Sequence, residues 1–153
     1  MSWIIWLVAL LVFWADFFVK VYFKTYLAGQ SIPVIPKILY FTVVFNKGAA
    51  FGILRGQTNF LIFIGLIFIL FLVIFVIRER KHKMVGLIAY GMILGGAISN
   101  FYDRIFLGYV IDYIDFKVWP VFNLSDSCIT VGAGILIFIH YFHPRHRKAA
   151  DDK

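Results

Sequence analysis

Four aspartates gathered in one stretch of the chain are the residues best suited to chemistry. Asp103, Asp112, Asp115 and Asp126 make up half of the chain's eight acidic residues. Two carboxylates held close together do not both ionise readily, so they share one proton. One can then take a proton from water while the other donates one, which is the chemistry needed to hydrolyse a peptide bond without a metal or a covalent intermediate. We expect Asp103 and Asp126 to form such a pair.

The composition places this chemistry in or beside a membrane. Hydrophobic residues make up 62% of the 153 residues, and charged residues only 15%. A soluble domain of this length has too much surface to hide so much apolar area. Lipid is therefore the expected solvent, and the length is that of one domain, residues 1–153. A span needs about 20 mostly apolar residues, and four candidates cover 3–23, 60–77, 84–101 and 126–142.

The net charge of +7 reflects membrane topology better than nucleic-acid binding. Lysine and arginine concentrate in two runs beside apolar segments, at 78–83 and 145–148. Such basic runs stay on the cytoplasmic side of a membrane. With four spans, both termini are then cytoplasmic, and the loops 24–59 and 102–127 face outward. We expect no nucleic-acid partner.

The outward loops carry strand and turn signals. Residues 38–45 are rich in β-branched and aromatic side chains, which predicts a strand, and 46–48 supplies a turn. Residues 49–54 fit a short interfacial helix, and 109–111 and 119–122 fit short strands. The expected fold is mainly α, with four transmembrane helices and a small extracytoplasmic β-cradle.

A stripe of small and polar residues along the third predicted span leads to Asp103. Gly91, Gly95, Ser99 and Asp103 recur every four residues and so share one helix face, with Asn100 beside them. Small residues at this spacing often serve only close helix packing. Packing alone does not account for the continuation of the stripe into Asn100 and Asp103 at the outer leaflet.

Asp126 begins a comparable face on the fourth span, which continues through Thr130 and Gly134. Taken alone, Asp126 would be interpreted as a helix cap. The third span ends and the fourth begins at the same outer surface, however. Asp103 and Asp126 can therefore meet there, which is the reason for proposing them as the pair.

The polar residues of the outer loops have simpler interpretations. Asp112 and Asp115 can pair with Arg104 or Lys117, or cap strands and turns. Asn46 is typical of a turn. None of these three residues requires a catalytic role on local grounds.

The first span carries two charges. Asp16 and Lys20 stand four residues apart and can neutralise each other on one helix face. Two charges in a span also mark a polar interior. A Ser–Lys dyad of Ser125 or Ser127 with Lys20 or Lys117 stays open as a second chemistry.

Other functions have weaker support. Cys128, the single cysteine, would need a histidine partner as a nucleophile, but the histidines at 82, 140, 143 and 146 all map to the inner side. No acid or cysteine joins the last three of these, so we expect neither a metal nor a cofactor. A proton-coupled transporter or channel and a non-enzymatic membrane adaptor stay open as alternatives.

Several motifs resemble those of one family. SNFYDR at 99–104 resembles GNxxDR, and FNLSDS at 122–127 resembles FNxAD. NKGAAFG at 46–52 resembles NxGAAF, VIDYIDF at 110–116 resembles VVDFIDF, and Asp16 and Lys20 fit the ends of DQxTK. On these motifs, which extend over nearly the whole chain, the sequence resembles lipoprotein signal peptidase, the type II signal peptidase family of bacteria.

The resemblance implies an aspartic endopeptidase of the bacterial cytoplasmic (inner) membrane with its active site near the outer face. Its substrates would be prolipoproteins with a diacylglyceryl group on the lipobox cysteine, cut immediately before that cysteine. The family's catalytic pair falls on Asp103 and Asp126. Other motif and supporting positions fall on Asn100, Arg104, Asn123, Asn46, Asp16, Lys20 and Asp112. Membrane lipid would be a partner, globomycin-type compounds would inhibit, and we expect a monomer.

The sequence departs from these motifs in four places. Phe17 and Val19 replace a Gln and a Thr, which removes two polar side chains from the first span. Ser99 replaces a Gly and Ser125 an Ala, and both are small enough to keep the backbones close. None of these departures alters the two proposed catalytic aspartates.

Overall fold

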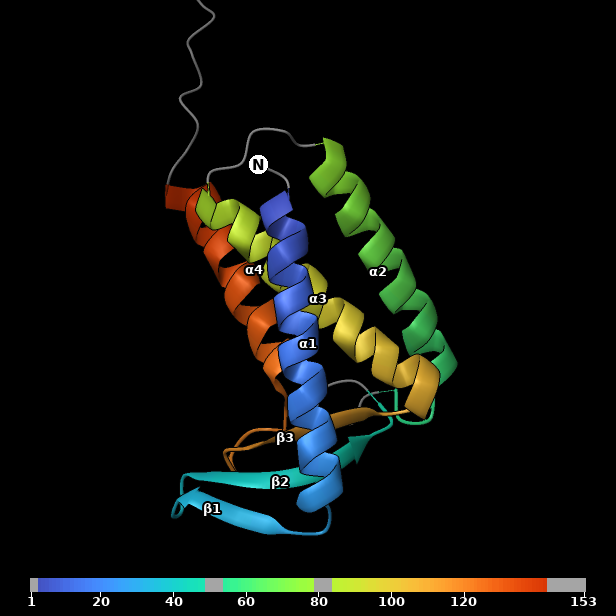
Figure 1. Ribbon diagram of the computed structural model, residues 1–153, viewed down its shortest axis with the longest axis vertical. Helices are drawn as coiled ribbons and strands as arrows, with labels where there is room; N and C mark the ends of the chain where they lie inside the picture. Colours follow the sequence, from blue (N-terminus) through green and yellow to red (C-terminus); the bar gives the residue numbers. More distant parts are fainter. Residues whose placement is uncertain (1–2, 49–53, 79–83, 143–153) are drawn as a thin grey trace, which may run out of the picture.

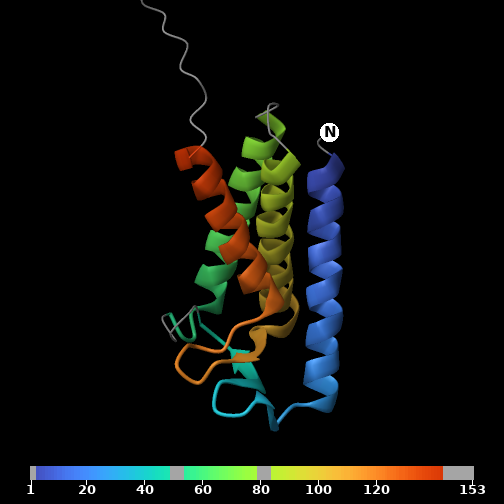
Figure 2. The same ribbon diagram turned by 90° about the vertical axis from the view of Figure 1, so that its left-hand side faces the viewer.

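Four long helices and a small sheet make up the fold of the computed structural model, which describes residues 3–48, 54–78 and 84–142. All four helices are long and apolar enough to cross a membrane. They run side by side as a bundle, and the sheet lies at one end of it (Figures 1 and 2). The expected fold class is thereby confirmed. The helices are α1 (Trp3–Tyr26), α2 (Thr58–Arg78), α3 (Met84–Leu107) and α4 (Leu124–Phe142).

Helix α3 continues beyond the predicted span, which ended at residue 101. It ends only at Gly108, whose φ of +79° is readily adopted by glycine. The Gly108 N–H donates to the Arg104 carbonyl and closes the last turn. Asp103 therefore lies on the helix whose face it was predicted to share, and Arg104 lies there too, although the loop was predicted to begin at residue 102.

Three antiparallel strands form the sheet, in the order β1 (Ser31–Ile35), β2 (Leu39–Asn46) and β3 (Val110–Asp115). In the ladder between β2 and β3, Val44 is opposite Asp112 and Asn46 is opposite Val110. The sheet is thus built from the two connections, 24–59 and 102–127, that were predicted to face outward. It covers the end of the bundle where α3 stops and α4 starts (Figure 1).

The strand predictions differ from the structure in detail. The strand predicted at 38–45 is β2, shifted by one residue, whereas β1 was not expected. Pro33 lies in β1, which is an edge strand, where a missing N–H is tolerated. The strand predicted at 119–122 is wrong except at its end, because Phe122 makes a single bridge to Ile114.

Some sequence predictions fall outside the described residues. The interfacial helix predicted at 49–54 lies outside them except for residue 54. The basic run at 78–83 lies outside them except for residue 78, and the basic run at 145–148 lies outside them entirely. The start of α1 and the end of α4 lie at the same end of the bundle, opposite the sheet (Figure 1). This arrangement agrees with an even number of spans.

Close approach at glycines brings three helices together. A Cβ added to Gly95 of α3 would lie 2.5 Å from the Ala9 carbonyl oxygen of α1. A Cβ added to Gly96 would lie 2.6 Å from the Ser125 carbonyl oxygen of α4. Neither position has room for a side chain, so α3 touches a neighbour on each side. The polar residues that follow on α3 are thereby held against both α1 and α4.

Candidate active site

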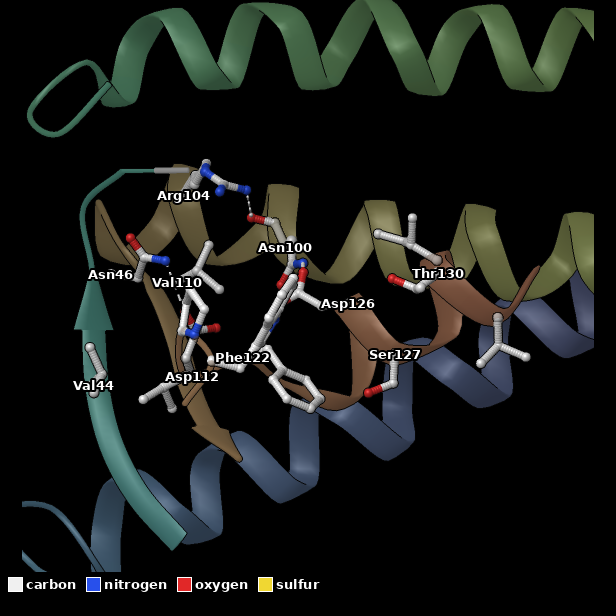
Figure 3. A pocket seen from close by; sticks show the side chains of 15 residues that line it. Val44, Asn46, Asn100, Arg104, Val110, Asp112, Phe122, Asp126, Ser127 and Thr130 are labelled. Carbon is white, nitrogen blue, oxygen red and sulfur yellow. Dashed lines mark hydrogen bonds between the residues drawn. The ribbon is translucent and has the colours of Figure 1, made fainter. Parts of the chain in front are cut away.

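An open cavity of about 780 Å³ lies where α3, α4 and the sheet meet. Asp112 and Asp126 line it together with Asn46, Asn100 and Arg104 (Figure 3). Asp103 is not among the described residues of its wall. The cavity thus exposes two carboxylates from different elements to one space.

Asp126 is held at the first turn of α4 by a reciprocal cap. Asn123 precedes the helix, and its Oδ1 accepts from the Asp126 N–H at 2.9 Å. In return, the Asn123 N–H donates to Asp126 Oδ2 at 3.3 Å. This is the capping-box arrangement, with a carboxylate as the second partner. The interpretation of Asp126 as a cap is therefore correct in part, but its Oδ1 also accepts from Asn100 Nδ2 at 2.8 Å.

Asp112 is held on β3 by two asparagine amides. Its Oδ2 accepts from Asn46 Nδ2 at 2.9 Å, and its Oδ1 accepts from Asn123 Nδ2 at 2.8 Å. Only 2% of the residue is exposed. Burial raises the pKa of Asp112 to about 7, the nearby Asp126 charge adds to this, and the two amide hydrogen bonds and the Lys20 charge oppose it. At neutral pH Asp112 therefore carries a proton part of the time.

Asp103 is directed toward α1 and β3. Its Oδ2 lies 2.9 Å from Lys20 Nζ and accepts from the Ile111 N–H at 3.2 Å. Lys20 in turn donates to Asn100, which donates to Asp126. The two aspartates of the predicted pair thus belong to one network, but the cavity joins Asp126 with Asp112.

Lys20 is buried at the centre of this network, with 2% of the residue exposed. Its Nζ lies 2.6 Å from Asp16 Oδ2, which confirms the ion pair predicted within the first span. The same Nζ donates to Asn100 Oδ1 at 2.9 Å. A buried ammonium is stable only with such a set of partners.

Asp16 is fully buried and joins three other elements. Its Oδ2 accepts from Ser99 Oγ on α3 and from Ser125 Oγ on α4, both at 2.6 Å. Its Oδ1 accepts from Tyr113 on β3 at 3.4 Å. The two serines that depart from the family motifs thus supply hydroxyl donors to Asp16.

Tyr113 was not expected to belong to the site. Its ring stacks on Phe23 at 4.5 Å, and its hydroxyl oxygen accepts from the Leu124 N–H at 3.0 Å. Burial raises the pKa of Tyr113, and the Asp16 charge adds to this. Local sequence does not distinguish a tyrosine of the polar network from a tyrosine of the apolar core.

Three further charged residues also have partners: Asp115, Lys117 and Arg104. Lys117 pairs with Asp115 at 2.6 Å, which confirms one predicted ion pair. Arg104 lines the cavity and donates to the backbone carbonyls of Asn100 and Gly48, each at 3.3 Å (the Asn100 contact is drawn in Figure 3).

The geometry gives no support to a Ser–Lys dyad. Ser125 donates to Asp16, and Ser127 donates to the Asn123 carbonyl. The Lys20 Nζ contacts the carboxylates of Asp16 and Asp103 and is bonded to neither Ser125 nor Ser127. These serines therefore act as donors to other groups.

An apolar wall completes the cavity, and the sequence did not predict it. Part of it comes from the segment after β3, which supplies an aromatic and aliphatic surface. The first turns of α4 supply another part, and Val44 of β2 and Val110 of β3 also contribute. The wall residues from the segment after β3 and from α4 are Trp119, Pro120, Val121, Phe122, Ile129 and Val131.

The sequence matches the signal peptidase (SPase) II family over residues 8–142. A lipoprotein signal peptidase of Desulfitobacterium hafniense is 36% identical over 150 residues, which cover 97% of this chain and 99% of the relative. A lipoprotein signal peptidase of Halothermothrix orenii is 49% identical over 109 residues, or 71% of this chain and 74% of the relative.

Two solved bacterial membrane enzymes have the same fold. One superimposes with a TM-score of 0.86 at 32% identity, covering 97% of this chain and 94% of its own. The other has a TM-score of 0.81 at 34% identity, covering 90% of this chain and 92% of its own. Because the family match covers residues 8–142 and a relative aligns over nearly the whole of both chains, the chain belongs to the signal peptidase II family.

Proposed function

We propose that this protein is an aspartic endopeptidase that removes the signal peptide from diacylglyceryl-modified prolipoproteins, cutting immediately before the lipidated cysteine. The observation that carries the proposal is the pair of carboxylates, Asp112 and Asp126, that opens into one cavity at the sheet end of the bundle. The substrate class follows from the relatives, which are lipoprotein signal peptidases.

In the proposed mechanism, the ionised Asp126 takes a proton from water while the water oxygen attacks the scissile carbonyl carbon. Protonated Asp112 donates its proton to the carbonyl oxygen, which gives a neutral gem-diol. Asp126 then returns its proton to the leaving nitrogen as the C–N bond breaks. Asp112 takes a proton from the diol, so both groups return to their starting states.

This assignment replaces Asp103 of the predicted pair with Asp112. The support is geometric: Asp103 Oδ2 is occupied by Lys20 and by the Ile111 N–H, whereas Asp112 lines the cavity. The pairing of Asp103 with Asp126 stays a prediction, and the same substitutions that test Asp112 also test it.

The proposed orientation puts the sheet and the cavity at the outer membrane surface. The basic runs at 78–83 and 145–148 favour a cytoplasmic location for the opposite end of the bundle, and hence for both termini. The exported part of a prolipoprotein would then meet the cavity directly. The apolar wall provided by Trp119 and Phe122 suits a substrate that enters from lipid.

The test of this function uses purified protein in liposomes with two forms of one prolipoprotein, with and without the diacylglyceryl group. We expect cleavage of the lipidated form alone, with product masses that put the cut before the modified cysteine. Equal cleavage of both forms, or a cut elsewhere, would contradict the proposed specificity. Chelators are expected to leave the rate unchanged, globomycin-type compounds to inhibit, and mass measurement to give a monomer.

The rate is expected to fall as pH rises through about 7. The pKa of Asp112 lies near 7, so its acidic form, which the mechanism needs, is lost above that pH. The measurement is kcat/KM against pH with the lipidated substrate, and the apparent value belongs to the carboxylate pair. A rate that rises through pH 7 would reverse the roles of the two aspartates.

Asn46→Ala is expected to move this falling limb to higher pH. The Asn46 amide donates to Asp112 and favours its ionised form, so its removal raises the pKa of Asp112 further. Thr42→Val, on the same strand, removes a hydroxyl that contacts Ser31 and serves as the control. If both variants keep the wild-type limb, Asp112 does not control it.

A further inference from the structure

The ammonium of Lys20 has two neutral partners that its charge balance does not require, Asn100 and, at 3.4 Å, the Ser99 hydroxyl. Asp16 and Asp103 already supply two carboxylates, at 2.6 and 2.9 Å. Lys20 Nζ nevertheless also donates to Asn100 Oδ1 at 2.9 Å. Of these partners, Asn100 alone is among the described residues that line the cavity.

This contact fixes the orientation of the Asn100 amide. Asn100 Oδ1 accepts from Lys20 Nζ and also from Asn123 Nδ2 at 3.0 Å. A flipped amide would put an NH₂ group against two donors, one of them charged. The Nδ2 atom must therefore point the other way, where it donates to Asp126 Oδ1 at 2.8 Å.

The Asn123 amide extends the connection to the second carboxylate. Its Nδ2 also donates to Asp112 Oδ1 at 2.8 Å, and its Oδ1 accepts from the Asp126 N–H. Figure 3 shows Asn100 beside Asp126, and Asp112 beside Asn46. Two amides thus connect a lysine outside the cavity to both carboxylates inside it.

We propose that Lys20 is a positioning residue, whose ammonium orients the Asn100 amide so that its N–H holds Asp126 in the geometry that activates water. The inference rests on the proposed peptidase function and assigns a role within it. Lys20 does not line the cavity, and it acts through Asn100.

Charged and titratable groups from four elements surround Lys20, and they decide the expected pH effect. They are Asp16 on α1, Asp103 and Arg104 on α3, Asp112 and Tyr113 on β3, and Asp126 on α4. Removal of the Lys20 charge leaves Arg104 as the remaining cation of this set. Asp112 should then keep its proton to higher pH, because the Lys20 charge lowers the pKa of Asp112.

The first experiment compares Lys20→Met with wild-type protein in liposomes, with the lipidated prolipoprotein as substrate. We expect kcat to fall by about 100-fold, as for a misplaced reacting group, with KM changed less than about threefold because binding contacts remain. The falling limb of the pH profile should move to higher pH. A loss of folded protein alone would lower the active fraction and leave the limb in place.

Lys24→Met is the matched control, because Lys24 lies one turn further along α1 and contacts the Tyr109 ring instead of the network. Lys24→Met should leave unchanged both kcat and the pH at which activity falls. If Lys20→Met behaves like this control, the proposal is overturned.

A double-mutant cycle with Asn100→Ala tests the route. If Lys20 acts through Asn100, the double variant should lose no more kcat than the more damaging single variant. If the two losses multiply, the residues act independently and the proposed route is wrong.

Two further variants separate the possible failures. If Lys20→Met does not fold, the double variant Asp16→Asn/Lys20→Met replaces it, because this variant removes one charge of each sign. It is compared with the single variant Asp16→Asn. If the two variants have equal kcat values and lose activity at the same pH, the proposal is overturned. Asp126→Asn tests the underlying function: if it cleaves at the wild-type rate, the carboxylate mechanism itself fails. If Asp126→Asn is inactive while Lys20→Met is fully active, the role of Lys20 alone is rejected.

Discussion

Asp126→Asn and Asp112→Asn are each expected to lower kcat/KM for a lipidated prolipoprotein by about 10³-fold or more. General acid–base groups contribute rate factors of about this size. Asparagine has nearly the shape of aspartate, and its remaining oxygen can still accept the hydrogen bond from Asn100 or Asn46. The substitutions therefore remove proton transfer while they keep most of the surrounding contacts.

The measurement should include thermal unfolding, so that lost activity is assigned only to folded protein. Asp103→Asn is the informative comparison. Because Asp103 contacts Lys20 and the Ile111 N–H, its loss should reduce stability and lower activity less than loss of Asp112. If Asp103→Asn is folded and inactive while Asp112→Asn is active, the pair predicted from the sequence is correct and the cavity-based pair is not.

Gly95→Ala is expected to destabilise the fold by about 1–3 kcal/mol, the range for an overpacked core. The added Cβ would lie 2.5 Å from the Ala9 carbonyl oxygen and 2.9 Å from the Ala9 Cα, both of them backbone atoms that cannot rotate away. Helix α1 would have to separate from α3. Because α1 carries Asp16 and Lys20, activity should fall together with stability.

Gly134→Ala is the matched control, because a Cβ there meets nothing within 4 Å. Alanine favours a helix over glycine by about 1 kcal/mol, so backbone preference alone predicts that both variants gain stability. If Gly95→Ala lowers the unfolding temperature while Gly134→Ala raises it, the difference is due to the contact between α1 and α3. A Gly95→Ala protein that unfolds at or above the wild-type temperature would show that α1 and α3 can move apart without loss.

Much of the architecture could be predicted from local sequence. The apolar runs are of spanning length and contain few charged side chains, which are costly in lipid. They form helices because lipid offers the backbone no hydrogen-bond partners. The stripe of Gly91, Gly95, Ser99 and Asp103 follows from helix periodicity, and the structure puts its glycines against α1. The strand at 39–46 follows from its β-branched and aromatic residues.

The site was less predictable because its contacts join residues that are distant in the chain. The sequence placed Asp103 at the end of a span, but the helix face that it shares with Gly95 packs on α1, so Asp103 meets Lys20 instead of the cavity wall. Asp112 appeared to be a loop residue, and only pairing of β3 with β2 brings it to Asn46. Strand β1 lacked a signal of its own because an edge strand is stabilised mainly by its neighbour.

The sequence by itself therefore determined a four-span membrane protein with a polar outer end rich in aspartate. It did so because hydropathy and helix period are properties of neighbouring residues. Only the tertiary structure decided which carboxylates share the cavity and which balance a buried lysine. The roles of these carboxylates depend on how α1, α3, β3 and α4 pack together. This packing is set by the close helix contacts at Gly95 and Gly96 and by hydrogen bonds between residues far apart in the chain.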